Sequence, residues 1–365
     1  MILDFLIKNN IIKQNKLIVD IGMFSTKLLE INYAAKKINV TSAKIFDNSR
    51  NSDEYELDFE NIARRTYEKA SGNGRKNVVA VLPTELTENK IITVKNKKEK
   101  DIPRIISREH MSFGRVSRIT HVVDYAYLGK RIESGDTVMY FLISAVKKSI
   151  ANDLVSAFAE YKMSVKTIIS NIYAQICLSE LFFDEYENLN RLFVDFGTNS
   201  IRVTAFAEGV AVYTRTIDMG FESYIKTISS SSETAGKSDI VKALNQVGEI
   251  TGLNDSAYGD VFRYLDKSVY VSCVKEVDNA VLRELQRIIA LCSSNDINIS
   301  KIYITGHILS GFEAKIKNDL NIECNYVEFF DNDEKSGRNY AIFTGNSGID
   351  GEFSVSLGAT IYPFI

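Results

Sequence analysis

The sequence predicts an α/β protein made of two related lobes, with a small α+β subdomain inserted in the first lobe. Three observations carry this prediction. A pattern of strand, Asp-x-Gly turn and strand occurs twice along the chain. Each copy is followed by a β-rich stretch and then by a helical pattern. The segment that comes next is expected to contain both strands and helices after the first copy, but only helices after the second. The two lobes have therefore diverged.

The two copies occupy residues 16–31 and 191–206. Each begins with a basic residue and three apolar residues and continues with Asp-x-Gly and a small polar turn. A second basic residue and an apolar strand then follow. A match of this length favours an internal duplication.

Strands and helices after each copy follow the same plan. After the first copy we expect a strand at 38–46 and a helix with an apolar face formed by Phe59, Ile62, Ala63 and Tyr67. After the second copy we expect a strand at 209–217 and a helix that opens near Gly220. Each lobe is therefore expected to have three strands and then a helix.

The inserted segment shows β alternation with two amphipathic stretches. The expected strands are 77–82, 90–94, 120–128, 137–146 and 165–169, with a polar turn at 130–136 and helices at 102–113 and 150–161. In the second lobe, residues 238–296 are expected to be helical, with Val277, Val281, Leu285 and Ile288 at helical spacing, before a strand at 301–305.

These elements give the expected domain boundaries. The first lobe comprises residues 1–84, 164–190 and 350–365, and the inserted subdomain comprises residues 85–163. The second lobe comprises residues 191–349, with a helical insertion at 225–296.

Composition excludes several classes of protein. The net charge of −3 gives no electrostatic reason to expect nucleic acid as a partner. The four cysteines are too far apart for a CxxC zinc site, so buried free thiols are expected. No apolar run approaches the roughly 18 residues that a membrane span needs, and the expected location is the cytoplasm. Residues 1–12 are interpreted as an edge strand or helix, with a weak membrane or partner contact as the alternative.

Asp20 and Asp195 each end an apolar strand one residue before a glycine-containing turn. An aspartate in this place can hold Mg²⁺, and a glycine lets the turn approach a phosphate closely. The exposed N–H groups of such turns can bind phosphate oxygens. Both aspartates are therefore candidate metal ligands, and the two turns are candidate phosphate loops.

The paired hairpins resemble the two phosphate loops of the actin/Hsp70/sugar-kinase superfamily, and the stretch from Tyr303 to Phe312 resembles its adenosine motif. Within the superfamily the chain is most similar to the PilM family of type IV pilus assembly proteins. That likeness includes the apolar run ending at Pro83, Gly220 after the second hairpin, and the stretch from Ser356 to Thr360. The resemblance implies an actin-like fold with two RNase H-like lobes.

The resemblance also implies roles for particular residues, in a site for ATP or ADP with Mg²⁺. The nucleotide and phosphate contacts it implies are Asp20, Gly22, Ser25, Lys27, Asp195, Gly197, Thr198, Asn199, Gly306 and Lys242, with Asp20 and Asp195 also on the metal. No residue is assigned as catalytic.

Two departures from the family pattern weaken the expected nucleotide site. Met23 stands where a small polar residue is usual after the first glycine, and it has no hydrogen to donate to a phosphate. His307 interrupts the glycine run of the adenosine motif. We therefore expect weak nucleotide binding with little or no hydrolysis. The alternative is that the hairpins are kept for the fold alone.

The function implied is that of a cytoplasmic scaffold in the pilus assembly platform, a ring or platform in which the chain also associates with itself. It implies a partner, the cytoplasmic tail of a PilN-like inner-membrane protein, so that contact with the membrane is indirect. An extended peptide is expected to bind where the inserted subdomain meets the first lobe, with Phe113, Tyr125 and Tyr127 as candidate pocket residues. The alternatives are a filament-forming ATPase of the FtsA or plasmid-segregation type, a type II secretion component, and a sugar or acetate kinase.

Overall fold

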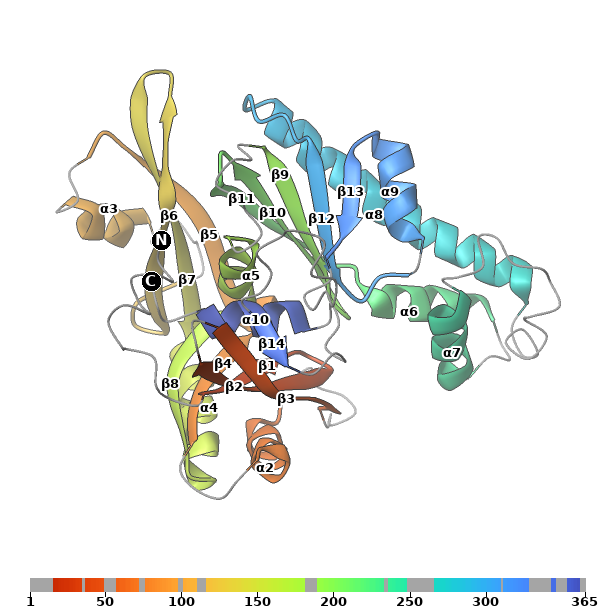
Figure 1. Cartoon of the computed structure of the whole chain (residues 1–365), viewed down its shortest axis with the longest axis horizontal. Helices are drawn as coiled ribbons and strands as arrows, with labels where there is room; N and C mark the ends of the chain where they lie inside the picture. Colours follow the sequence, from red (N-terminus) through yellow and green to blue (C-terminus); the bar gives the residue numbers. More distant parts are fainter. Residues whose placement is uncertain are drawn as a thin grey trace. The chain divides into compact units, whose positions relative to one another are not determined.

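A computed structural model of the 365-residue chain describes residues 16–34, 37–48, 57–71, 76–97, 101–109, 116–180, 189–232, 236–247, 266–309, 311–327, 343–345 and 353–361. The chain divides into two compact units. Of the described residues, the first unit holds those within Met1–Glu187, Gly209–Thr214 and Glu328–Ile365, and the second holds those within Asn188–Glu208 and Arg215–Val327. Figure 1 shows the helices and strands of both units.

The first unit is built on a six-stranded sheet in the order β14-β3-β2-β1-β4-β8. Its strands are β1 Lys16–Ile21, β2 Ser25–Ala34, β3 Lys37–Asp47, β4 Lys76–Leu82, β8 Met163–Ser170 and β14 Phe343–Gly345. Strands β1, β2 and β3 are antiparallel neighbours, whereas β4 runs parallel to both β1 and β8.

Helices cover both faces of this sheet, as Figure 1 shows. They are α2 Phe59–Lys69 and α4 Lys148–Glu160 on one side, and α5 Asn171–Glu180 and α10 Ser354–Ile361 on the other. Leu17, Val19 and Ile21 of β1 pack against Ile62 of α2 and Phe158 of α4. Because β1 and β4 are buried on both faces, they are apolar along nearly their whole length.

A second, three-stranded sheet in this unit has the order β5-β7-β6. Its strands are β5 Thr87–Lys95, β6 His121–Glu133 and β7 Asp136–Lys147, with the short helix η1 Thr84–Leu86 leading in and α3 Ile102–Glu109 packed against it. The expected polar turn at 130–136 is wrong. Strand β6 continues to Glu133, and the turn is formed by Ser134 and Gly135, both at positive φ. Such a two-residue turn matches the twist of the hairpin strands that it joins.

A five-stranded sheet in the order β11-β10-β9-β12-β13 belongs mainly to the second unit, although the first five residues of β11 fall in the first unit. Its strands are β9 Arg191–Phe196, β10 Ile201–Ala207, β11 Val210–Ile217, β12 Lys301–Gly306 and β13 Glu323–Tyr326. Its helices are α6 Phe221–Ser231, α7 Lys237–Val247, α8 Lys267–Ser293 and α9 Phe312–Leu320. The order β3-β2-β1-β4-β8 of the first sheet repeats here strand for strand, which confirms the internal duplication predicted from the sequence.

Several other expectations are met in the described residues. Val277, Val281, Leu285 and Ile288 form a buried stripe along α8. All four cysteines are buried free thiols. None of the helices that the structure describes is long and apolar enough to span a bilayer. Residues 1–12 and Phe113 lie outside the described residues.

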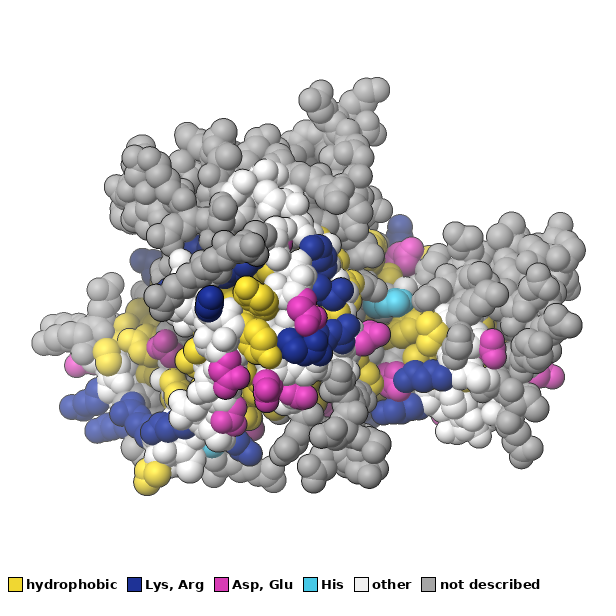
Figure 2. All heavy atoms as spheres, turned by 90° about the horizontal axis from the view of Figure 1, so that it is seen from below, with side chains coloured by type: hydrophobic (Ala, Val, Ile, Leu, Met, Phe, Trp, Pro, Cys, Tyr) yellow, Lys and Arg dark blue, Asp and Glu magenta, His cyan; other side chains and the backbone are white. Residues whose placement is uncertain are grey.

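The expected domain boundaries stay a prediction, and one packing detail bears on them. Helix α4, which the sequence analysis assigned to the inserted subdomain, contributes Leu154 and Phe158 to the core formed by β1, β4 and α2. Figure 2 shows one face of the molecule, on which lysine and arginine side chains lie among aspartate and glutamate side chains. The expectation that nucleic acid is not a partner also stays a prediction.

Candidate functional site

The first Asp-x-Gly turn joins β1 to β2 in the first unit. The antiparallel register pairs Asp20 with Lys27 across the hairpin. Within the turn, the Gly22 N–H donates a hydrogen bond of 2.9 Å to the Ser25 carbonyl. A side chain at Gly22 would place its Cβ 2.8 Å from that same carbonyl oxygen, so the tight turn needs glycine.

Asn48, which the sequence analysis missed, holds this turn in place. Its Nδ2 donates to the Gly22 carbonyl at 2.6 Å, and its backbone N–H donates to the Phe24 carbonyl at 2.7 Å. Its Oδ1 accepts from the Thr26 hydroxyl at 2.7 Å. Because Asn48 and Thr26 are both buried, these bonds lie away from water and fix the turn more firmly than surface bonds would.

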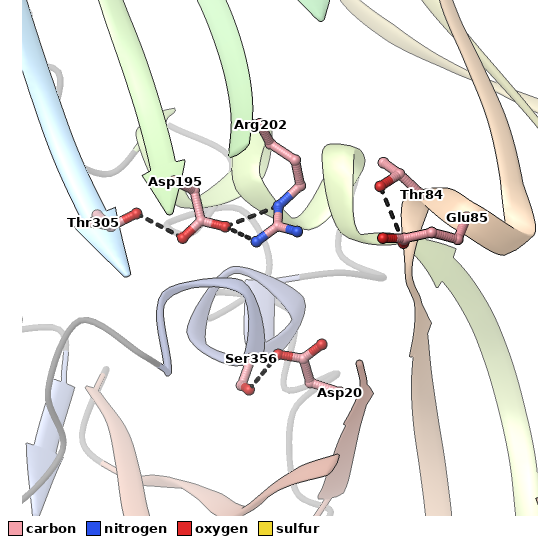
Figure 3. A network of polar contacts seen from close by, with 7 residues as sticks. All are labelled: Asp20, Thr84, Glu85, Asp195, Arg202, Thr305 and Ser356. Carbon is pink, nitrogen blue, oxygen red and sulfur yellow. Dashed lines mark hydrogen bonds and ion pairs between the residues drawn. The ribbon is translucent and has the colours of Figure 1, made fainter. Parts of the chain in front are cut away.

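Asp20 is buried and 8% exposed. Its Oδ2 accepts a hydrogen bond of 3.0 Å from the hydroxyl of Ser356 on α10, as Figure 3 shows. A hydroxyl donor stabilises the carboxylate without neutralising its charge. The carboxylate oxygens of Asp20 are the kind of ligand that a cation such as Mg²⁺ prefers.

The second Asp-x-Gly turn joins β9 to β10 in the second unit, and its aspartate has different surroundings. Asp195 is 2% exposed. Its Oδ1 accepts from the Thr305 hydroxyl of β12 at 2.9 Å. Its Oδ2 accepts from Arg202 Nε at 2.9 Å, and a second guanidinium nitrogen also bonds to the same oxygen (Figure 3).

The backbone of this second loop is held by the start of α6. The Gly197 N–H donates to the Ser200 carbonyl at 3.0 Å, which closes the turn. The Phe221 N–H donates to the Gly197 carbonyl at 3.1 Å, and the Glu222 N–H donates to the Thr198 carbonyl at 2.8 Å. Among the described residues, no acceptor contacts the N–H of Thr198 or Asn199, so both remain available to a phosphate.

The candidate adenosine turn follows β12 in the same unit. Gly306 has a φ of 87°, and a Cβ there would lie 2.2 Å from the Phe196 carbonyl oxygen, so only glycine fits. The His307 N–H donates to that carbonyl at 2.9 Å. The His307 ring lies on the ring of Phe221, with centroids 3.9 Å apart and planes tilted by 30°. This turn is thus joined to the β9–β10 loop through Phe196 and Phe221.

The predicted residues fall into two local groups. Asp20, Gly22, Ser25 and Lys27 share the first hairpin, while Asp195, Gly197, Thr198, Asn199 and Gly306 are brought together in the second unit. Lys242 lies in α7, and its side chain is outside the described residues. Their roles toward nucleotide and metal stay predictions.

Sequence reasoning also missed three polar partners of these groups, Asn48, Thr305 and Ser356. A fourth partner, Arg202, could have been recognised from the sequence, since both copies of the repeat carry a basic residue at the same offset from the aspartate.

Comparison with known proteins gives the family. Residues 18–341 match the family model for the type IV pilus assembly protein PilM. A solved PilM-PilN type IV pilus biogenesis complex is similar to the chain, with a TM-score of 0.73 and 15% identity over 96% of this chain and 98% of that chain. The ethanolamine utilization protein EutJ from Carboxydothermus hydrogenoformans has a TM-score of 0.52 and 11% identity over 96% of this chain and 90% of that chain. No curated protein sequence gives a significant match.

The family match covers most of the chain, and the similarity to the solved complex extends over nearly its full length. The fold class predicted from the sequence is confirmed, including the duplicated lobes and the inserted subdomain. The chain therefore belongs to the PilM family of type IV pilus assembly proteins and has an actin-like fold.

Proposed function

We propose that the chain is a cytoplasmic scaffold of the type IV pilus assembly platform and binds the cytoplasmic tail of a PilN-like inner-membrane protein. The observation that carries the proposal is the match to the PilM family over residues 18–341. The similarity to a solved PilM-PilN complex supports the identity of the partner. Membrane contact is indirect in this proposal, through the partner.

The tail is proposed to bind as an extended peptide in the first unit, where the three-stranded sheet meets the larger one. Strand β6 lies at one edge of the order β5-β7-β6, and an edge strand can accept an added strand. Tyr125 and Tyr127 are 41% and 47% exposed, and both rest on Phe141, with ring centroids 6.1 and 5.4 Å away. Such half-exposed aromatic side chains offer apolar contact to alternate side chains of a peptide.

Nucleotide binding is the second part of the proposal. The phosphate groups of ADP or ATP would contact Gly22, Ser25 and Lys27 of the first loop or the N–H groups of Thr198 and Asn199 in the second. The adenosine would lie near Gly306, with a contact from Lys242. Mg²⁺ is proposed at Asp20, whose buried carboxylate accepts a hydrogen bond from the Ser356 hydroxyl.

The nucleotide is proposed to set the geometry of the scaffold rather than to be consumed. Met23 supplies no hydrogen-bond donor from its side chain beside the first loop. In the second unit, the ring of His307 is already stacked on Phe221. Both features favour weak binding with little hydrolysis.

Immobilising the tail of the PilN-like protein of the same organism on a resin tests the proposed function. The purified full chain should be retained by this tail and not by a peptide with the same residues in scrambled order. Equal retention on both resins would show that the partner assignment is wrong.

A further inference from the structure

Both carboxylate oxygens of Asp195 accept hydrogen bonds from side chains of the same unit. Thr305 takes one oxygen, and the guanidinium of Arg202 takes the other with two of its nitrogens. The pair is deeply placed, since the side chain of Asp195 is 3% exposed and that of Arg202 is 12% exposed. Figure 3 shows Asp195 between Thr305 and Arg202, with all three side chains directed at one another.

The register of the hairpin makes this pairing a property of the fold. Arg202 is the cross-strand partner of Asp195 in the antiparallel pair β9 and β10. A Cβ on Gly197 would lie 3.0 and 3.1 Å from the two terminal nitrogens of Arg202. The glycine of the loop therefore makes room for the guanidinium as well as for the turn.

A divalent metal ion does not fit these surroundings. Mg²⁺ needs oxygen ligands in near-ideal octahedral geometry, and both oxygens of Asp195 already accept hydrogen bonds. A metal ion on Oδ2 would have to displace the guanidinium or lie beside its positive charge with little water between them. In the described part of the chain, no group of three or more His, Cys, Asp or Glu side chains could hold a metal ion.

A phosphate group fits better than a metal ion does. The guanidinium is always charged and matches the geometry of phosphate oxygens. The adjacent loop offers the N–H groups of Thr198 and Asn199, to which no described acceptor is bonded. The ion pair with Asp195 has no net charge, so the guanidinium offers directed N–H donors while the carboxylate adds no uncompensated negative charge beside a phosphate.

We propose that Arg202 takes the place of the divalent cation at the second loop, so that this unit binds nucleotide phosphate groups without a metal ion. Asp195 then acts as a positioning residue that holds the guanidinium against Gly197. The inference rests on the proposed nucleotide binding. It specifies that the second loop binds a nucleotide that carries no metal ion.

The first hairpin is the internal comparison. It carries Lys27 opposite Asp20, at the same offset that places Arg202 opposite Asp195. Asp20, however, accepts from the neutral hydroxyl of Ser356. Asp195 accepts from the guanidinium of Arg202 and from the hydroxyl of Thr305.

Calorimetry of ADP binding to the full chain tests the inference, with excess Mg²⁺ in one series and EDTA in the other. To keep any metal at the first loop out of the comparison, both series use the Asp20→Asn variant.

We expect the two dissociation constants to agree within about threefold. Adding Arg202→Gln should weaken metal-free ADP binding by about tenfold or more, whereas Arg202→Lys, which keeps the charge, should lose less. A loss of more than about tenfold in EDTA, or an unchanged affinity with Arg202→Gln, would overturn the inference.

A second readout needs no nucleotide. Mn²⁺ is titrated by electron paramagnetic resonance into Asp20→Asn and into Asp20→Asn/Asp195→Asn, after circular dichroism has shown that both are folded. The inference expects the same Mn²⁺ binding by both variants, and a site present in the first and lost in the second would overturn it. If ADP binds in neither buffer, the proposed nucleotide function fails, and the Mn²⁺ titration still decides whether Asp195 holds a metal ion.

Discussion

The hydroxyl of Tyr224 in α6 donates a hydrogen bond of 2.9 Å to a carboxylate oxygen of Asp278 in α8. Both residues are buried, and the bond joins two helices of the second unit. Burial raises the pKa of Asp278 to about 6, although the bond from Tyr224 and the charge of Lys315 act in the other direction and Asp319 adds to the rise. Burial raises the pKa of the Tyr270 phenol, and the charge of Asp278 adds to the rise.

This buried carboxylate predicts a pH dependence of stability. Because the folded pKa of about 6 is above the unfolded value of 3.8, the folded state binds the proton more tightly, and stability falls as pH rises from about 4 to about 6. Asp278→Asn removes the titration and keeps an acceptor for Tyr224. The variant should therefore be more stable than the parent at pH 7, by up to about 3 kcal/mol, and of similar stability at pH 4. Urea unfolding at both pH values checks this, and a constant difference between the proteins would contradict it.

The ion pair of Asp195 and Arg202 predicts a large stability loss on breaking it. Asp195→Ala leaves the guanidinium buried without its carboxylate, which should cost about 3–5 kcal/mol. Arg64→Ala is the control, because Arg64 pairs with Glu68 on the exposed face of α2 and its loss should cost under about 1 kcal/mol. Chemical unfolding of both variants measures the difference, and equal effects would show that the buried pair is not needed for stability.

Gly306 and Gly209, both at positive φ, form a matched pair for a backbone test. Gly306 and Gly209 have φ angles of 87° and 80°, yet only at Gly306 would a Cβ meet another atom, the Phe196 carbonyl oxygen at 2.2 Å. Gly209→Ala should cost about 1–2 kcal/mol, the usual penalty for a side chain in the left-handed region. Gly306→Ala should cost clearly more or prevent folding, because the turn after β12 must also move away from β9. Thermal unfolding of the two variants checks the order of these effects.

Turnover of ATP separates a scaffold from an ATPase or a kinase. With Mg-ATP, the full chain should release phosphate more slowly than about 1 per second, which lies at the low end of enzyme turnover rates. Ultracentrifugation with and without nucleotide belongs beside this assay, since long filaments would favour the FtsA-like alternative. Faster turnover, or nucleotide-dependent pelleting, would contradict the proposed scaffold.

Much of the fold could be predicted from the sequence because the repeat fixes it. The strands around each Asp-x-Gly turn and the stripe on α8 follow from local patterns of apolar residues. The end of β6 did not, because Lys130, Arg131 and Glu133 suggested a turn. In the structure Arg131 and Glu133 pair with each other on one face of a continuing strand. The Ser134–Gly135 dipeptide is typical of a two-residue hairpin turn, and the polar residues before it made the turn look longer than it is.

The site was predictable only where its residues are neighbours in sequence. Ser356 reaches Asp20 across 336 positions, and Thr305 reaches Asp195 across 110. No local pattern encodes such contacts, since they depend on how helices and strands pack. Arg202 could have been found, because antiparallel pairing across a hairpin places it opposite Asp195.

Titration of the PilN-like tail into the full chain tests the central claim most directly. The account predicts a dissociation constant in the micromolar range, about −8 kcal/mol, and a loss of about tenfold or more for the Tyr125→Ala/Tyr127→Ala variant. Tyr67→Ala, at an exposed tyrosine of α2, is the control and should bind as the parent does. No measurable binding by the parent chain would contradict the claim that this is a PilN-binding scaffold, and unchanged affinity of the β6 variant would place the tail elsewhere.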